Sequence, residues 1–175
     1  MNFESLYRSH YDFVWRTLRR LGVCDRNVED ACQIVFLNAY RRLPQFEGRS
    51  SLKTWLCGIS VKVASDYRRS ASVRREKLVE PPPSEVPFSA EQQQQVEQRE
   101  RLEEVDAILA QLPIEQRTVL VLHELEQLTG EEIATIEGLP LGTVRSRLRL
   151  AREAFLLLAT ERSLSDGKKA AGGHR

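Results

Sequence analysis

The sequence predicts an all-α protein built from two small helical domains that are joined by a flexible linker. Apolar residues recur at spacings of three and four along most of the chain, which is the helical period. A Pro- and Gln-rich stretch over residues 81–95 interrupts this pattern. The 175 residues, 41% of them apolar, are enough for two small cores. We therefore expect domains over residues 1–80 and 96–163, followed by a disordered basic tail over residues 164–175.

The first domain begins with two amphipathic helices. One extends from Phe3 to Leu21 and ends at Gly22, and the next starts at Asp25 or Asn27, either of which can cap it. The residues expected on the buried side of the second helix are Val28, Ala31, Cys32, Val35, Phe36 and Ala39. Its exposed side carries Asp30, Gln33, Leu37 and Arg41. An exposed leucine among polar groups is typical of a protein contact patch, although single exposed leucines are also normal.

A loop over residues 44–51 then leads through a serine cap into a third helix, Leu52–Arg69. The apolar stripe of this helix is Leu52, Trp55, Leu56, Ile59 and Val63, which leaves Lys53, Lys62, Ser65, Asp66 and Arg69 outside. Basic and polar groups beside a loop with Phe46 and Gly48 suit the binding of a single nucleic-acid strand. An equally good interpretation of Phe46 is a core aromatic residue in a tight turn.

The second domain starts with a helical pattern from Val96 to Leu112. Pro113 can occupy the first turn of the following helix, whose apolar residues are Val119, Leu120, Leu122 and Leu125. Thr129 and Glu132 then have the spacing of a capping box, so another helix begins there. Gly138 and Pro140 end that helix and redirect the chain. This pattern predicts a helix-turn-helix unit over residues 128–155.

The last helix of this unit has one apolar and one basic face. Val144, Leu148, Ala151 and Phe155 form a single stripe. Away from that stripe lie Gly142, Arg145, Ser146 and Arg149, flanked by Arg147 and Arg152. Arginine can bind a guanine edge or a phosphate with two hydrogen bonds, and small residues permit close approach to the groove floor. The cap, turn, stripe and basic face together predict a DNA-recognition helix rather than a solvated basic face on an ordinary helical hairpin.

Charge is distributed unevenly although the formal net charge is only +1. Residues 1–80 carry 15 Lys and Arg against 9 Asp and Glu, residues 81–142 carry 3 against 13, and residues 143–175 carry 8 against 3. Two basic ends separated by an acidic middle indicate two modules that face polyanions.

Other classes of protein are disfavoured. The chain has neither a run of eighteen apolar residues nor a signal-peptide pattern, so we expect a cytoplasmic location. Cys24, Cys32 and Cys57 are odd in number and form no C-x-x-C pair, which favours buried free thiols. A zinc or redox site that uses Cys24 or Cys32 with His10 is the alternative. No constellation for acid–base or nucleophilic catalysis is found, so neither an enzyme nor a cofactor is expected.

Four motifs in order give the chain a family resemblance. They are D-x-x-Q-x-x-F at Asp30, Gln33 and Phe36, F-E-G-R-S-S-L-K-T-W-L at Phe46–Leu56, L-P-x-x-Q-R-x-V-L at Leu112–Leu120, and G-L-P-x-G-T-V-R-S-R-L at Gly138–Leu148. With these, the chain resembles the extracytoplasmic-function class of the bacterial sigma-70 family over about 150 residues. The resemblance implies region 2, which binds the clamp coiled coil of core RNA polymerase and opens the −10 element. It also implies region 4, which reads the −35 element and contacts the flap, and an anti-sigma partner.

The resemblance assigns residues to three surfaces. It implies core polymerase contacts at Asp30, Gln33, Leu37 and Arg41. It implies −10 contacts at Phe46, Gly48, Arg49, Ser50, Lys62, Ser65 and Asp66. It implies −35 contacts at Arg145, Ser146 and Arg149, with Thr143, Arg147, His123 and Thr129 near the phosphates. Departures from the family pattern are Ile34 in place of a glutamate, Lys62 in place of an asparagine, and Leu150 in place of a basic residue.

Two other functions remain compatible with the residues alone. One is a self-sufficient helix-turn-helix repressor or activator, which predicts tight binding to palindromic DNA without polymerase. The other is a redox or metal sensor, which predicts that activity depends on the three cysteines.

Overall fold

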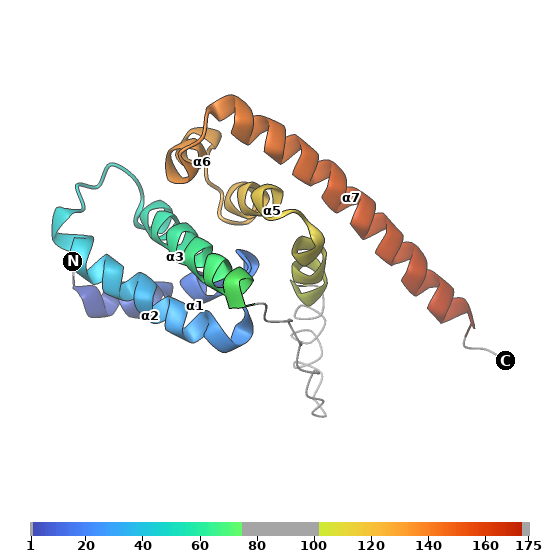
Figure 1. The fold of residues 1–175 in the computed structure, drawn as a ribbon, viewed down its shortest axis with the longest axis horizontal. Helices are drawn as coiled ribbons and strands as arrows, with labels where there is room; N and C mark the ends of the chain where they lie inside the picture. Colours follow the sequence, from blue (N-terminus) through green and yellow to red (C-terminus); the bar gives the residue numbers. More distant parts are fainter. Residues whose placement is uncertain (1, 75–101, 173–175) are drawn as a thin grey trace.

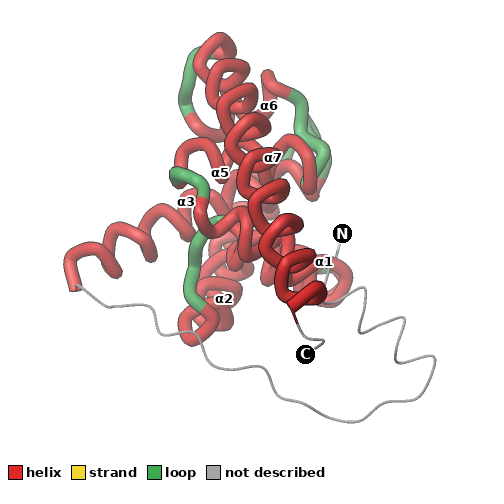
Figure 2. The backbone as a smooth tube through the Cα atoms, turned by 90° about the vertical axis from the view of Figure 1, so that its right-hand side faces the viewer, coloured by secondary structure: helices red, strands yellow, loops and turns green. Residues whose placement is uncertain are grey.

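The computed structural model describes residues 2–74 and 102–172, and within them every regular element is a helix (Figure 2). This confirms the predicted all-α fold. The N-terminal bundle comprises α1 (Phe3–Arg20), α2 (Asp25–Arg42), the short 3-10 helix η1 (Leu43–Gln45) and α3 (Leu52–Arg74). The C-terminal bundle comprises helical residues 102–111, α5 (Ile114–Leu120), the π-helical turn η2 (Val121–Leu125), α6 (Gly130–Glu137) and α7 (Leu141–Gly172). The linker predicted over residues 81–95 lies outside the described residues.

The N-terminal bundle is formed by α1, α2 and α3, which pack pairwise around Leu18, Val35 and Leu56, all without exposed surface. Side chains cap two of the helices. The Asn2 carboxamide accepts a hydrogen bond from the Glu4 N–H at 3.1 Å, and the Ser51 hydroxyl accepts one from the Thr54 N–H at 3.0 Å. The predicted serine cap of the third helix is therefore confirmed.

In the C-terminal bundle, α6 and α7 form the predicted helix-turn-helix. Thr129 and Glu132 make both hydrogen bonds of a capping box at the start of α6. Gly138 ends α6 with φ of 66°, a left-handed conformation that disfavours residues with a Cβ. The predicted inward stripe of α7 is confirmed, because Val144, Leu148 and Ala151 are buried and Phe155 is half-buried against the same core.

The sequence did not predict the π-helical turn that follows α5. After α5 the backbone widens into the π-helical turn η2, and the Glu126 N–H donates to the Val121 carbonyl, five residues earlier, at 3.1 Å. Gln127 then takes a positive φ of 60° before α6 begins. This detour directs Glu126 toward the N-terminal bundle, where its side chain is only 6% exposed.

The end of the chain differs from the prediction. A disordered tail is expected from residue 164, whereas α7 continues to Gly172. Once a helix is nucleated, each further residue adds a hydrogen bond, and Lys and Ala in this segment favour the helix. The far part of α7 projects from the body of the molecule (Figure 1). It carries exposed leucines, namely Leu156, Leu157 and Leu164.

The two bundles pack against one another and share one continuous apolar core. Helix α3 lies against α6, where a Cβ placed on Gly58 would be 3.6 Å from Ile136 Cγ1. The sequence pattern predicts two bundles but not this contact, since it arises between residues far apart in the chain.

The Gly138 conformation provides a test of this fold. Replacing Gly138 with Ala should lower the free energy of unfolding by about 1–2 kcal/mol, because a Cβ strains the left-handed backbone even where it meets no neighbour. Gly142→Ala is the matched control, since Gly142 lies in the first turn of α7 and a Cβ there also meets nothing. It should stabilise the protein by up to about 1 kcal/mol. Urea unfolding measures both, and effects of the same sign would contradict this account.

Candidate nucleic-acid interface

The basic face of α7 is exposed on the side opposite its buried stripe. Arg145, Ser146 and Arg149 are all exposed, while Val144 and Leu148, each directly before one of the two arginines, are buried. This alternation follows from about 100° of rotation per residue, which fixes the arginines outward once the apolar residues point inward. Guanidinium groups beside a small serine match the hydrogen-bonding edges in a DNA major groove.

The arginines of α7 differ in their ion pairs. Arg149 pairs with Glu153 at 2.7 Å and Arg152 pairs with Glu124 at 2.5 Å. Among the described residues, Arg145 has no acidic side chain in ion-pair range. Exposed pairs contribute at most about 1 kcal/mol, so Arg149 can exchange Glu153 for DNA at small cost. Arg145 is therefore the guanidinium that is most available for a base contact.

The four residues predicted near DNA phosphates lie on three elements. Thr129 is the exposed N-cap of α6, and its hydroxyl is engaged with the Glu132 carboxylate at 3.2 Å. Thr143 and Arg147 are half-buried in α7, and His123 is half-buried in η2. Burial raises the pKa of Glu137, and the positive charges of Arg147 and Arg68 offset part of this rise. Arg147 thus already faces one negative charge within the protein.

The loop predicted to contact the −10 element is largely polar and exposed, and its aromatic side chain, Phe46, is half-buried. Phe46 packs against Trp55, with ring centroids 5.0 Å apart, which supports the interpretation of Phe46 as a packed aromatic residue. Gly48 is exposed with φ of 69°, Arg49 pairs with Glu47, and Ser50 is half-buried. The loop accordingly presents charge and backbone rather than a free aromatic ring.

Two of the three −10 residues predicted on α3, Lys62 and Asp66, border a hollow between α3 and α2. Lys62 and Asp66 are exposed, Ser65 is half-buried, and Asp66 pairs with Arg69 at 2.8 Å. The hollow has a volume of about 230 Å³ and is lined by Ile34, Asn38, Arg42, Ile59, Lys62, Val63, Asp66 and Tyr67. None of the four predicted loop residues lines it. The structure therefore brings Lys62 and Asp66 together but leaves the loop as a separate surface.

The predicted polymerase-binding residues share one exposed face of α2, on which Asp30, Gln33, Leu37 and Arg41 are all exposed. Leu37 is 49% exposed, and Ile34 and Tyr40 nearby are 41% and 59% exposed. The apolar part of this face is thus larger than the single leucine that the sequence singled out. Tyr40 was missed because its side chain packs sideways against Phe3, with ring centroids 5.0 Å apart, which no local pattern reveals.

The cysteines do not converge on a metal or redox site. Cys32 and Cys57 are buried and Cys24 is half-buried, and no group of three metal-ligating side chains lies together in the described part of the chain. His10 is turned toward its own helix, with Nδ1 3.1 Å from the Leu6 carbonyl oxygen. Burial raises the pKa of Cys32 to about 11 and that of Cys57 to about 12. Such thiols are poor nucleophiles and poor ligands at neutral pH. Over the described residues, no helix has the length and apolarity needed to span a membrane.

Two family models and several curated proteins match the chain. The model of Sigma-70 region 2 matches residues 6–74, and that of Sigma-70, region 4 matches residues 102–155. The RNA polymerase sigma-H factor of Pseudomonas aeruginosa is 36% identical over 146 residues, which cover 74% of this chain and 72% of that protein. The ECF RNA polymerase sigma-E factor of Escherichia coli K12 is 37% identical over 143 residues, with coverage of 74% and 72%. The ECF RNA polymerase sigma factor SigC of Mycobacterium tuberculosis is 31% identical over 161 residues, with coverage of 87% and 80%.

Solved structures share the fold. The sigma factor RpoE of Bartonella quintana, in complex with the anti-sigma factor NepR, aligns with a TM-score of 0.69 and 21% identity over 90% of this chain and 96% of that one. CnrH, in complex with the cytosolic domain of CnrY, aligns with a TM-score of 0.64 and 23% identity over 91% and 88%.

The raised thiol pKa values predict unequal cysteine reactivity. At pH 8 a colorimetric thiol reagent should modify Cys24 first, because only roughly a thousandth of Cys32 and a ten-thousandth of Cys57 is thiolate at that pH. In denaturant all three should react alike. Cys32 and Cys57 should react in slower phases, and the phase that disappears in Cys32→Ala or Cys57→Ala identifies the thiol that causes it. Reaction of either buried thiol as fast as that of Cys24 would revive the sensor hypothesis.

Proposed function

This chain is an RNA polymerase sigma factor of the extracytoplasmic-function class, a member of the sigma-70 family, and we propose how its surfaces divide the work. It docks on core polymerase through α2. It reads the −35 element with α7, and it reads the −10 element with α3 and the loop that precedes α3. It has no catalytic activity of its own. Its place of action is the cytoplasm, where promoter DNA and core polymerase meet.

The observation that carries the −35 assignment is the exposed Arg145–Ser146–Arg149 face, which a buried stripe and a capped, Gly-terminated α6 hold in orientation. In a helix-turn-helix, the second helix enters the major groove while the first crosses the backbone. Arg145 and Arg149 then reach base edges. Thr129, Thr143, Arg147 and His123 lie near the phosphates that flank them.

For the −10 element we propose that Lys62, Ser65 and Asp66 form the reading face. Lys62 is exposed at the rim of the hollow between α2 and α3, where its ammonium can hold a backbone phosphate. Asp66 can accept a hydrogen bond from a base amino group when Arg69 releases it. The loop residues Gly48, Arg49 and Ser50 add backbone and guanidinium donors. The packed rings of Phe46 and Trp55 support this loop from below.

For core polymerase, the proposed contact is the face of α2 with Asp30, Gln33, Leu37 and Arg41. Charged residues at its ends give orientation, and the half-exposed Leu37 provides an apolar centre. The departures Ile34 and Leu150 are 41% and 39% exposed, so they can alter the polymerase contact and the preferred promoter without disturbing either core.

An anti-sigma factor is the proposed regulator. Of the two solved structures named above, one contains an anti-sigma factor and the other contains the cytosolic domain of CnrY. The apolar area around Leu37 and Tyr40 is the kind of exposed patch that a competing protein covers.

Run-off transcription tests this function directly. Core polymerase with the wild-type chain should yield promoter-dependent transcripts from a genomic library. Asp30→Arg should reduce all of them at least tenfold, because a reversed charge opposes docking. Asp12→Arg, the same charge change on the exposed face of α1, should leave them unchanged. If the wild-type chain yields no transcripts yet binds palindromic DNA alone, the repressor function replaces this one.

Base contacts and phosphate contacts are expected to respond differently. Arg145→Ala should remove about 1–3 kcal/mol of discrimination between −35 sequences, because a guanidinium on a base edge is lost. Arg147→Ala should weaken binding to all sequences alike and lower the slope of log K against log salt by about 1. Holoenzyme binding to labelled promoters at several salt concentrations measures both. Equal effects on every promoter for the two variants would contradict the assignment.

A further inference from the structure

Leu150 is an exposed apolar residue on the arginine-bearing side of α7. Its side chain is 39% exposed, and it directly follows Arg149 in the sequence. Its neighbours Leu148 and Ala151 are buried members of the hydrophobic core, to which Leu150 does not belong. The apolar surface of Leu150 is therefore available to whatever binds this side of α7.

Helix geometry places Leu150 close to the middle of the face that points away from the core. The inward direction of α7 is defined by its buried stripe, which is Val144, Leu148 and Ala151. At about 100° per residue, Ser146 lies almost directly opposite that stripe, and Arg149 and Leu150 lie about 50° to either side of the opposite direction. Leu150 therefore faces outward as directly as Arg149, which is proposed to reach a base edge.

The charges along this face separate Leu150 from the leucines further along α7. The first acidic residue of α7 is Glu153, whose carboxylate pairs with Arg149 at 2.7 Å. When Arg149 turns to DNA, this carboxylate is left on the same face and repels the phosphates, so the groove contact should end near Glu153. Leu150 lies before this limit, whereas the exposed Leu157 and Leu164 lie beyond it.

A leucine on this face has one chemically distinct target in a DNA major groove. Guanine, cytosine and adenine present hydrogen-bond donors and acceptors there, and thymine adds an apolar C5 methyl group. A leucine side chain has neither a donor nor an acceptor. Covering the edge of a G·C pair with it would leave polar groups without partners, which costs free energy. Leu150 is thus suited to thymine and unsuited to a G·C pair.

We propose that Leu150 is a specificity-determining residue that packs on the C5 methyl group of a thymine in the −35 element. The inference rests on the proposed reading of that element by α7. Ser146 and Leu150 are about 6 Å apart along the helix axis, so this thymine lies within about two base pairs of the base that Ser146 approaches. An arginine in place of Leu150 would favour guanine there, whereas the leucine favours an A·T pair.

Selection from a promoter library tests the assignment. The strongest promoter from the genomic run-off screen is randomised over its −35 region, and the duplexes bound by core polymerase with the wild-type chain are sequenced. Leu150→Ala should lower the preference for thymine at one position by about threefold or more, because the methyl contact is lost. Leu150→Arg should replace thymine by guanine at that position. Unchanged preferences in both variants would overturn the role of Leu150.

Leu157 provides the matched control on the same helix. It is 67% exposed and lies beyond Glu153. Leu157→Ala shortens the same kind of side chain, and Leu157→Arg adds the same charge, so the second variant reveals any general gain in affinity for phosphates. Both should leave every base preference unchanged. If they alter the same position as the Leu150 variants, the effect is not a direct contact and the proposal is wrong.

Removal of the methyl group alone is the sharpest test. In the selected duplex, the thymine at the sensitive position is replaced by deoxyuridine, which keeps the base pair but lacks the C5 methyl group. Competition binding of the wild-type holoenzyme should weaken by about fourfold, the effect of one buried methyl group. Binding of the Leu150→Ala holoenzyme should change by less than about 1.5-fold, because its contact is already absent. Equal weakening in both proteins would overturn the contact.

The same measurements distinguish a failure of this inference from a failure of the proposed function. If the wild-type holoenzyme selects no base at any −35 position, the assignment of α7 to that element is wrong, and the role of Leu150 is wrong with it. If the wild-type holoenzyme selects a −35 sequence that the Leu150 variants also select, only the role of Leu150 is overturned. Thermal unfolding of each variant confirms that the exposed substitutions leave the fold intact.

Discussion

The burial of one stripe of α7 is the constraint on which the proposed DNA-binding surface depends. Val144, Leu148 and Ala151 can lie against the C-terminal core in only one rotation of the helix. That rotation turns Arg145 and Arg149 outward, and the capped, Gly-terminated α6 sets the direction in which α7 leaves the turn. The same apolar residues thus stabilise the bundle and orient the guanidiniums, so a loss of packing in this stripe is also expected to weaken the proposed DNA contact.

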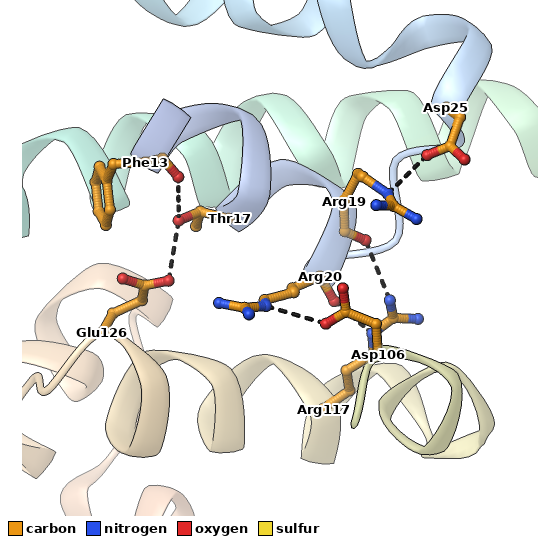
Figure 3. A network of polar contacts seen from close by, with 8 residues as sticks. All are labelled: Phe13, Thr17, Arg19, Arg20, Asp25, Asp106, Arg117 and Glu126. Carbon is orange, nitrogen blue, oxygen red and sulfur yellow. Dashed lines mark hydrogen bonds and ion pairs between the residues drawn. The ribbon is translucent and has the colours of Figure 1, made fainter. Parts of the chain in front are cut away.

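Helix ends perform a similar double role between the bundles. At the end of α1, Arg68 of the same bundle donates to the Leu21 carbonyl, and Arg117 of the other bundle donates to the carbonyls of Arg19 and Arg20 (Figure 3). Gly22 permits this crowding, because its φ of 90° and missing side chain leave room for both guanidiniums. One unsatisfied helix terminus therefore contributes to the N-terminal fold and to the contact between the bundles.

Local features of the sequence predict much of this structure. Three features depend on residues that are close in the sequence: the capping box of Thr129 and Glu132, the end of α6 at Gly138, and the buried stripe of α7. All three are confirmed. The π-helical turn was not predicted. Its backbone hydrogen bonds span five residues instead of four, and the amino-acid preferences of the segment do not distinguish the two patterns. The contacts of Glu126 with Thr17 and Lys53 join residues far apart in the chain, and no period or motif records such pairs. The site residues on α2, α3 and α7 remain predictions, although the structure places most of them on exposed faces.

Polar side chains help to define where the two bundles meet. Buried ion pairs add little net stability over apolar residues, because desolvation offsets their attraction, but they tolerate only one arrangement of their partners. In the pair of Glu126 and Lys53 only the Glu126 carboxylate is buried, and its partners Thr17 and Lys53 favour one arrangement of the two bundles. The polar contacts therefore set where the bundles meet, and the surrounding apolar area sets how firmly they stay together.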